Sequence, residues 1–137
     1  MTTTTTAIDT DIALVRNGFD VLESGNLAGF ADLFHPDATW NHRNDDHLGG
    51  IHQGSDGIIA FIAESMQLTA GTLRVPVETY LGDGAGRVCV LVHVTGSRPD
   101  GRTFDDAQVL VFRLDGDRVR SVDQYIGDGA AVTAFWA

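Results

Sequence analysis

The sequence has a single cysteine, few basic residues and no long hydrophobic run, and each shortage excludes a class of protein. One cysteine cannot form an internal disulfide, and Cys89 lies in an apolar run, so we expect a reducing, cytoplasmic environment. No apolar stretch approaches the roughly 18 residues that a membrane-spanning helix needs. Nine Lys and Arg residues are scattered among nineteen Asp and Glu residues, with a formal net charge of −10. That balance argues against nucleic acid and against an anionic membrane surface as partners.

The composition that remains is typical of one globular domain. A chain of 137 residues, 43% hydrophobic and 20% charged, is long enough to bury a core without disulfides or metals. Met1 is followed by five threonines, which form neither the basic nor the apolar region of a secretory signal. We therefore predict a disordered tail over residues 1–7 and a single domain over residues 8–137.

Helical spacing dominates the first half of the chain. Apolar residues recur about every 3.6 positions over residues 9–24, which predicts a helix with Asp9 or Thr10 as its cap. A second helix is predicted over residues 27–34, and a third begins near Ser55. A short strand over residues 38–42 and a polar loop over residues 43–50 are predicted between them.

The period changes to about 2 in the second half. Strand-like runs cover residues 73–81, 87–97, 102–114 and 118–126, and Gly- and Asp-containing turn signals separate them. Helices followed by a meander of antiparallel strands predict an α+β fold, in which helices cover one side of a sheet.

Several stretches resemble one family. Residues 33–40 (LFHPDATW) are similar to the start of the first strand in SnoaL-like proteins, and residues 50–58 to the approach to their third helix. Residues 109–116 resemble their FRL-containing hairpin, and Phe135-Trp136 a frequent ending. The chain thus resembles SnoaL-like and ketosteroid isomerase-like proteins of the nuclear transport factor 2-like superfamily. This resemblance implies a cone-shaped, curved antiparallel sheet packed against three N-terminal helices, enclosing one deep pocket for a small hydrophobic molecule.

The resemblance also implies acid–base chemistry. The general-base aspartate on the last strand of SnoaL-type cyclases falls on Asp123, and the base position of ketosteroid isomerases falls on His42. The two oxyanion positions of the isomerases fall near Gly18 and Leu110, which argues against a true steroid isomerase. We predict that Asp123 abstracts a proton next to a carbonyl and that His42 is the second acid/base. Isomerisation, aldol-type cyclisation or dehydration of a polyketide- or steroid-like substrate would follow.

Six further residues are predicted to bind the substrate. An inward polar group on an apolar strand face is costly unless it has a partner, so polar residues of the 102–114 run are expected to orient a ligand. A tyrosine on the last strand is positioned to donate to a developing enolate, and aromatic residues are expected in the walls of an apolar cavity. The six are Gln108, Tyr125, Trp40, Asp106, Phe61 and Phe112.

Alternative interpretations stay open. Asp123 is equally compatible with a strand-end carboxylate paired with Arg118 or Arg120, and His42 with hydrogen bonding to the loop that follows it. A non-catalytic protein that binds a small apolar ligand is the second hypothesis. An epoxide hydrolase, which would need an Asp-Arg-Asp relay, is the third.

Neither a metal nor an organic cofactor is expected. His42, His47 and His52 lie along a loop with Asp45 and Asp46 but show no known ligand spacing. As partners we expect a small hydrophobic molecule and a second copy of the chain. Apolar residues on both faces of the 87–97 run predict that the outer face of the sheet packs on another subunit as a homodimer.

Overall fold

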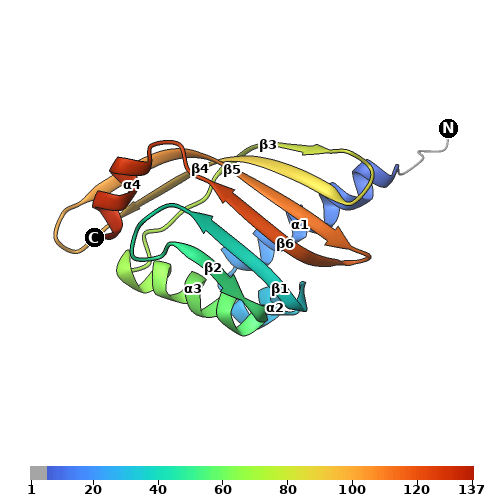
Figure 1. Ribbon diagram of the computed structural model, residues 1–137, viewed down its shortest axis with the longest axis horizontal. Helices are drawn as coiled ribbons and strands as arrows, with labels where there is room; N and C mark the ends of the chain where they lie inside the picture. Colours follow the sequence, from blue (N-terminus) through green and yellow to red (C-terminus); the bar gives the residue numbers. More distant parts are fainter. Residues whose placement is uncertain (1–5) are drawn as a thin grey trace.

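The computed structural model describes residues 6–137 and has an α+β architecture (Figure 1). A six-stranded sheet curves around helices that come mainly from the N-terminal half of the chain. The predicted curved sheet packed against three N-terminal helices is confirmed. The elements are α1 (Ala7–Glu23), α2 (Leu27–Ala31), β1 (Phe34–Arg43), β2 (Gly50–Gln53), α3 (Gly54–Leu68), β3 (Val77–Gly82), β4 (Arg87–Ser97), β5 (Thr103–Asp115), β6 (Arg118–Tyr125) and α4 (Gly129–Trp136).

The strands lie in the order β2-β1-β6-β5-β4-β3. All neighbouring strands are antiparallel except β1 and β6, which run parallel. These two strands are far apart in the sequence, so the chain between them is long enough for the crossover that a parallel pair needs. Their register pairs Trp40 with Val122 and His42 with Gln124, which brings the middle of the chain beside its end.

A capping box begins α1. The Thr6 hydroxyl accepts a hydrogen bond from the Asp9 N–H at 3.1 Å, and the Asp9 carboxylate accepts one from the Thr6 N–H at 3.4 Å. This reciprocal pair satisfies two backbone N–H groups that the first helical turn leaves free. The expected cap at Asp9 or Thr10 is therefore wrong, and Ala7 belongs to the helix. Residues 1–5 of the predicted tail lie outside the described residues.

The second helix is shorter than predicted, because β1 begins earlier. α2 ends at Ala31, and Phe34 is already part of the strand. The Phe34 ring is 3% exposed and packs edge-on against Phe30, with ring centroids 5.1 Å apart. Burial of this ring in the core, together with Pro36 just after it, favours the extended conformation over another helical turn.

Two short elements were not predicted. Residues 50–53 form the edge strand β2 on β1, directly after the predicted loop over residues 43–50. The last residues form α4, which Asp128 caps by accepting a hydrogen bond from the Ala131 N–H at 3.1 Å. α4 lies near the end of the sheet where β4 turns into β5 (Figure 1). Of the helices over residues 6–137, none is long and apolar enough to cross a membrane.

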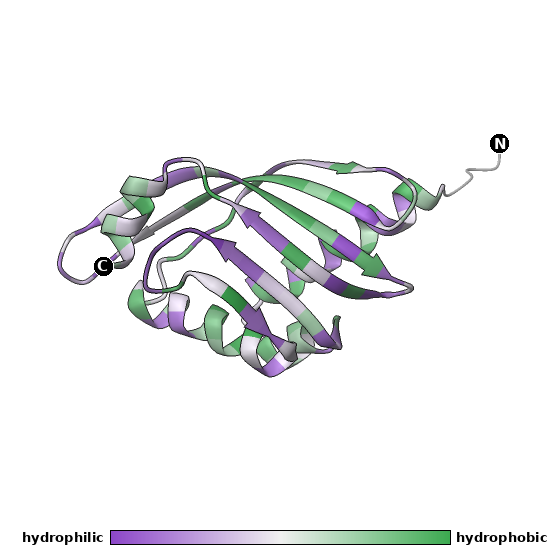
Figure 2. Ribbon diagram, viewed as in Figure 1, coloured by the Kyte–Doolittle hydropathy of each residue, from purple (hydrophilic) through white to green (hydrophobic). Residues whose placement is uncertain are grey.

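Alternation along the strands separates the two faces of the sheet. The inward side chains of β4 are at most 8% exposed, whereas Cys89 and Leu91 point outward and are half-buried. Hydrophilic and hydrophobic stretches accordingly interleave along the strands (Figure 2). The inward face and the helices together enclose the core. The inward residues of β4 are Val88, Val90, Val92 and Val94.

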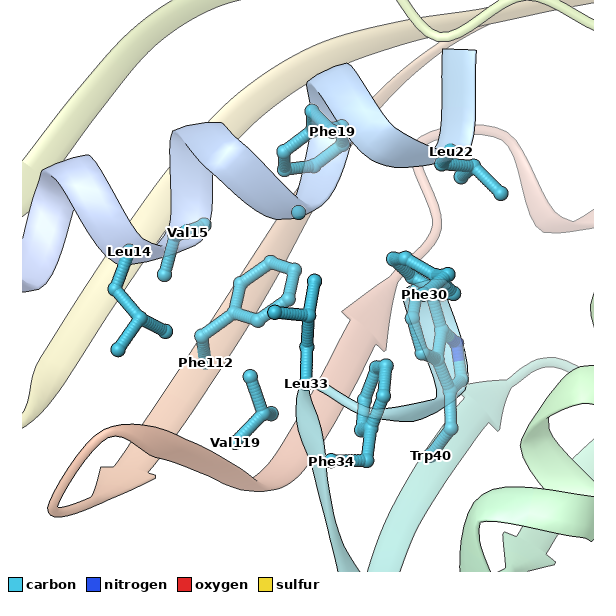
Figure 3. A pocket seen from close by; sticks show the side chains of 11 residues that line it. Leu14, Val15, Phe19, Leu22, Phe30, Leu33, Phe34, Trp40, Phe112 and Val119 are labelled. Atoms are coloured by element: carbon cyan, nitrogen blue, oxygen red, sulfur yellow. The ribbon is translucent and has the colours of Figure 1, made fainter. Parts of the chain in front are cut away.

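A small void lies between α1, α2 and the sheet (Figure 3). Its volume is about 20 Å³, enough for about one water molecule, and its wall is almost wholly apolar. Phe112 and Trp40 form part of that wall, and Gly18 of α1 faces it. Because a water molecule would find almost no hydrogen-bond partner there, we interpret the void as imperfect packing rather than a binding site.

Candidate functional site

A cavity of about 820 Å³ lies between the concave face of the sheet and helices α1 and α3. This volume is within the range of sites for drug-sized ligands, and such sites are mostly apolar. Apolar side chains make up most of the walls, with Leu48, Phe61 and Leu110 among the most buried. Exposed charged side chains of Arg16, Asp20, Glu23 and Arg74 line its solvent side.

A chain of side-chain hydrogen bonds crosses the buried part of the cavity wall. The Trp40 indole N–H donates to Gln124 Oε1 at 3.0 Å, and Gln124 Nε2 donates to Gln108 Oε1 at 2.8 Å. Gln108 Nε2 in turn donates to Asp106 Oδ2 at 3.0 Å. All four side chains point to the concave face from neighbouring strands, and all four are at most 8% exposed. Buried polar groups need such partners, and here each one has them.

His42 joins this chain and links it to a buried carboxylate. Its Nδ1 lies 2.9 Å from Gln124 Oε1, and its Nε2 lies 2.8 Å from Asp46 Oδ2. The side chain of His42 is 2% exposed and that of Asp46 is 0% exposed. Burial raises the pKa of Asp46, but hydrogen bonds from His42, Asn44 and the Leu48 N–H, with the charge of His42, bring that pKa below its usual value.

Helix α4 and the two residues before it hold both ends of this arrangement. The backbone N–H groups of residues 127–128 donate to the Asp106 carboxylate at 3.0 and 2.8 Å. The Asn44 amide donates to Asp46 Oδ2 at 2.7 Å and to the Thr133 hydroxyl at 3.1 Å. Thr133 donates to the backbone carbonyl oxygen of Asp45 at 3.1 Å. The C-terminal helix therefore supports the loop that carries Asp46.

The two glutamines keep hydrogen-bonding capacity for a ligand. Oε1 of Gln124 accepts two hydrogen bonds and Nε2 donates one, so one amide N–H has no acceptor among residues 6–137. Gln108 keeps one amide N–H and one lone pair on Oε1. The site can thus donate to a carbonyl oxygen and accept from a hydroxyl group.

The structure brings most of the predicted site residues together. His42, Trp40, Gln108 and Phe61 line the cavity. Asp106 lies directly behind Gln108 and orients its amide. Phe112 instead lines the small apolar void, where it packs edge-on against Trp40 with ring centroids 6.3 Å apart (Figure 3).

The two other predicted residues point away from the cavity, which corrects our expectation for them. Asp123 pairs with Arg43 at 3.0 Å and with Arg113 at 2.8 Å on the outer face of the sheet. Tyr125 lies on the same face, 44% exposed, with the Arg43 guanidinium 5.0 Å from its ring centre. Side chains alternate along a strand, and in β6 it is Val122 and Gln124 that face inward. The prediction that the face of Asp123 lines the cavity is wrong.

Sequence reasoning missed Gln124 and Asp46. The sequence did contain a signal for Gln124. This residue follows the apolar Val122 by two positions and so shares its inward face of β6, opposite to the face of Asp123. Asp46 lies four residues after His42 in a loop, where no periodicity predicts which way a side chain points.

The other histidines of this loop have separate partners. His47 pairs with Glu64 at 2.6 Å near the surface. His52 Nε2 donates to the Leu48 carbonyl oxygen at 2.8 Å, and its ring stacks on Phe61 with centroids 4.2 Å apart. Within residues 6–137, no group of three or more His, Cys, Asp or Glu side chains is arranged to hold a metal ion.

The curved open sheet wrapped around helices is the fold of the nuclear transport factor 2-like proteins among the solved structures that this chain resembles. Within that class, residues 15–122 match the SnoaL-like domain family. The chain belongs to this family, and the resemblance seen in its sequence is confirmed.

Three similar proteins illustrate the relationship. The uncharacterized protein Rv0034 of Mycobacterium tuberculosis is 28% identical over 129 residues, which cover 94% of this chain and 98% of that protein. The structure of Bal32a, from a soil-derived mobile gene cassette, has a TM-score of 0.91 and 25% identity, covering 96% of this chain and 99% of that one. TerC, co-crystallised with polyporic acid, has a TM-score of 0.80 and 20% identity, covering 92% and 97%. At that identity the likeness to TerC shows the fold alone.

Proposed function

We propose that this protein is an acid–base enzyme that binds a hydrophobic organic molecule in its cavity and transfers a proton to or from an oxygen-bearing part of it. The observation that carries the proposal is the buried His42–Asp46 pair, whose histidine lies in the wall of a mostly apolar cavity. A carboxylate behind an imidazole orients the ring and stabilises its protonated form, which suits the imidazole for proton transfer near neutral pH. The co-crystallisation of TerC with polyporic acid supports an organic ligand for a cavity of this fold.

The chemistry assigned to each residue follows from its contacts. His42 Nδ1 lies on the side of the glutamine amides, so a ligand oxygen that takes the place of Gln124 Oε1 would meet this nitrogen. A proton passed from this nitrogen to a carbonyl oxygen, while water takes a proton from the neighbouring carbon, gives the enol. Passed to a hydroxyl oxygen, with the neighbouring carbon again losing its proton to water, it lets that hydroxyl leave as water. Asp46 stays behind the ring and stabilises the charge. Isomerisation, aldol-type cyclisation and dehydration all begin with such a step.

The ligand is expected to carry its oxygen at one end of an apolar body. Gln108 and Gln124 offer two amide N–H groups and one lone pair beside His42, whereas the neighbouring walls are apolar. A polyketide- or steroid-like ketone or hydroxyketone meets both requirements, because its oxygen satisfies the amides while its rings displace water from the walls.

Deuterium exchange tests this proposal. The protein is incubated in heavy water with a panel of cyclic ketones and aromatic polyketones, and exchange next to the carbonyl is followed by NMR. We expect His42→Asn and Asp46→Asn to lower the accelerated rate by about 10²-fold or more, the usual contribution of a positioned acid or base. Asp123→Asn is the matched control, because the Asp123 carboxylate lies on the outer face of the sheet. We expect this variant to exchange the ketones at the wild-type rate. Equal rates for all three variants would contradict the assignment.

A second candidate is a non-catalytic ligand-binding protein. It is favoured by one observation: both ring nitrogens of His42 already have partners, Gln124 and Asp46. This candidate predicts that several compounds of the panel raise the melting temperature while none exchanges faster than in buffer. It also predicts that His42→Asn changes affinity without any chemical consequence.

We also propose that the protein forms a homodimer through the outer face of the sheet. Half-buried apolar side chains of β4 and β5 form its middle, and Leu81 and Tyr125 are exposed on it. Glu78 and Asp105 lie toward one end of this face and Arg87 and Arg113 toward the other, so a two-fold related copy would place opposite charges together. Light scattering at micromolar concentration should give a dimer, and Leu91→Arg a monomer. A wild-type monomer would contradict this.

A cytoplasmic location completes the proposal. Its support is the lone Cys89, which has no disulfide partner in this chain and suits a reducing compartment. Fractionation of cells that express a tagged protein would test it, and recovery from an extracytoplasmic fraction would overturn it.

A further inference from the structure

Trp40 and His42 share one acceptor. The indole Nε1 and the imidazole Nδ1 lie 3.0 and 2.9 Å from the same oxygen, Oε1 of Gln124. An indole nitrogen only donates hydrogen bonds, so the amide atom that faces it must be the oxygen. Trp40 therefore requires that Oε1, and not Nε2, be the Gln124 amide atom that faces the indole.

The far side of the network requires the same orientation. Gln124 Nε2 donates to Gln108 Oε1, and Gln108 Nε2 donates to the Asp106 carboxylate, which accepts from the backbone N–H groups of residues 127–128. A reversed Gln124 would place its NH₂ group against the indole N–H and its oxygen against the oxygen of Gln108. Both ends of the chain of hydrogen bonds thus disfavour the reversed amide, because each reversed contact would face two donors or two acceptors toward each other.

The orientation of Gln124 decides the state of His42. Because Oε1 can only accept, Nδ1 of the imidazole must carry a proton to make the 2.9 Å contact. The other nitrogen, Nε2, faces Asp46 Oδ2 at 2.8 Å, a contact that also needs a proton between the two atoms. Asp46 is the charged group in contact with the ring, while Gln124 and the edge-on ring of Phe61 are uncharged neighbours.

We propose that Trp40 is a positioning residue that, through the Gln124 amide, keeps His42 protonated at Nδ1, so that this histidine meets a ligand as a proton donor rather than as an acceptor. The lowered pKa of Asp46 agrees with this assignment, because a carboxylate leaves the second proton on Nε2. The inference describes the resting protein, and it holds whether or not the cavity catalyses a reaction. Its failure is therefore distinguishable from that of the proposed function.

The test reads the two ring nitrogens of His42 directly. Long-range proton–nitrogen NMR correlations of ¹⁵N-labelled protein distinguish protonated from bare nitrogens, and the signals are assigned by their loss in His42→Asn. At neutral pH we expect both nitrogens of the wild-type protein to be protonated. In Trp40→Phe, where only the Gln108 contact still holds the Gln124 amide, we expect the Nδ1 signal to move toward the position of a bare nitrogen.

Two further variants keep the test decisive. Phe112→Leu is the matched control, because it removes an aromatic ring that packs on Trp40 without touching a hydrogen bond of the network, and its His42 signals should equal those of the wild type. Gln124→Met removes the shared acceptor and should reproduce the effect of Trp40→Phe if that variant does not fold. A bare Nδ1 in the wild type at neutral pH, or unchanged signals in both Trp40→Phe and Gln124→Met, would overturn the proposal.

Discussion

Asn44 and Thr133 lie 89 positions apart in the chain, yet the Asn44 amide nitrogen is 3.1 Å from the Thr133 hydroxyl oxygen. The same amide nitrogen donates to Asp46 at 2.7 Å, so helix α4 contacts the loop that carries the buried carboxylate. This contact joins the last helix of the fold to the candidate site in its cavity wall.

Thr133→Val should loosen that support. Valine has nearly the same shape but neither accepts from Asn44 nor donates to the Asp45 carbonyl oxygen, so two hydrogen bonds between the helix and the loop are lost. We expect a loss of about 0.5–1.5 kcal/mol in the free energy of unfolding, measured in urea. Thr133→Ser keeps the hydroxyl and is the control. Equal stabilities of the two variants would show that the hydroxyl contributes nothing.

The stability that Asp46 provides should depend on pH. A carboxyl whose pKa is lowered by folding stabilises the protein above the pKa it has in the unfolded chain, and this contribution disappears as the pH falls through the folded value. We expect the difference in unfolding free energy between the wild type and Asp46→Asn to be greatest near neutral pH. The difference should shrink below about pH 4, where the carboxyl becomes protonated. A difference that stays constant from neutral to acid pH would contradict the assignment.

His93 should titrate above its ordinary range. Hydrogen bonds to Asp105 and Glu78 and the charges of these carboxylates raise the pKa of His93 on the outer face, although partial desolvation opposes them. A raised pKa stabilises the folded protein at low pH, and this contribution is lost as the pH rises through the folded value. NMR titration should give a midpoint above 6.5, the ordinary value, in the wild type and a lower one in Asp105→Asn. Identical midpoints would show that the contact does not persist in solution.

Gly18→Ala should stabilise the protein. Gly18 lies within α1, where glycine is less favourable than alanine by up to about 1 kcal/mol. A Cβ atom there would meet Leu33 at 3.4 Å and Phe30 at 3.9 Å, which are ordinary contacts at the wall of the small void. We expect a gain of about 0.5–1 kcal/mol in urea unfolding. Gly29→Ala is the contrasting variant, because its Cβ would lie 2.5 Å from the Asn26 side chain, and a loss is expected there.

Periodicity predicted the elements that repeat one pattern over many residues. The strands β4 and β5 agree with the predicted runs to within a residue or so, because alternation over eleven or more positions leaves no other interpretation. The short elements β2 and α4 were missed. β2 depends on pairing with β1, and α4 on the cap at Asp128, so neither has a long pattern of its own.

The candidate site was predicted in part for the same reason. Gln108 was found because it lies on a strand next to inward apolar residues. Trp40 was found as an aromatic wall residue, and His42 because it occupies the base position of the ketosteroid isomerases. Asp123 was chosen by resemblance to a family motif, and the motif does not say which face of β6 turns inward. A shift of one position reverses the face, and that is why Gln124 and not Asp123 belongs to the cavity wall.

The sequence by itself determined the α+β class of fold, because this class follows from periodicity summed over many residues. Only the tertiary structure decided which polar groups meet inside. Parallel pairing of β1 with β6 sets His42 beside Gln124, and a loop without periodicity brings Asp46 to the ring. Hydrogen bonds between side chains depend on register and on distances of a few tenths of an ångström, and the local pattern of residues contains neither.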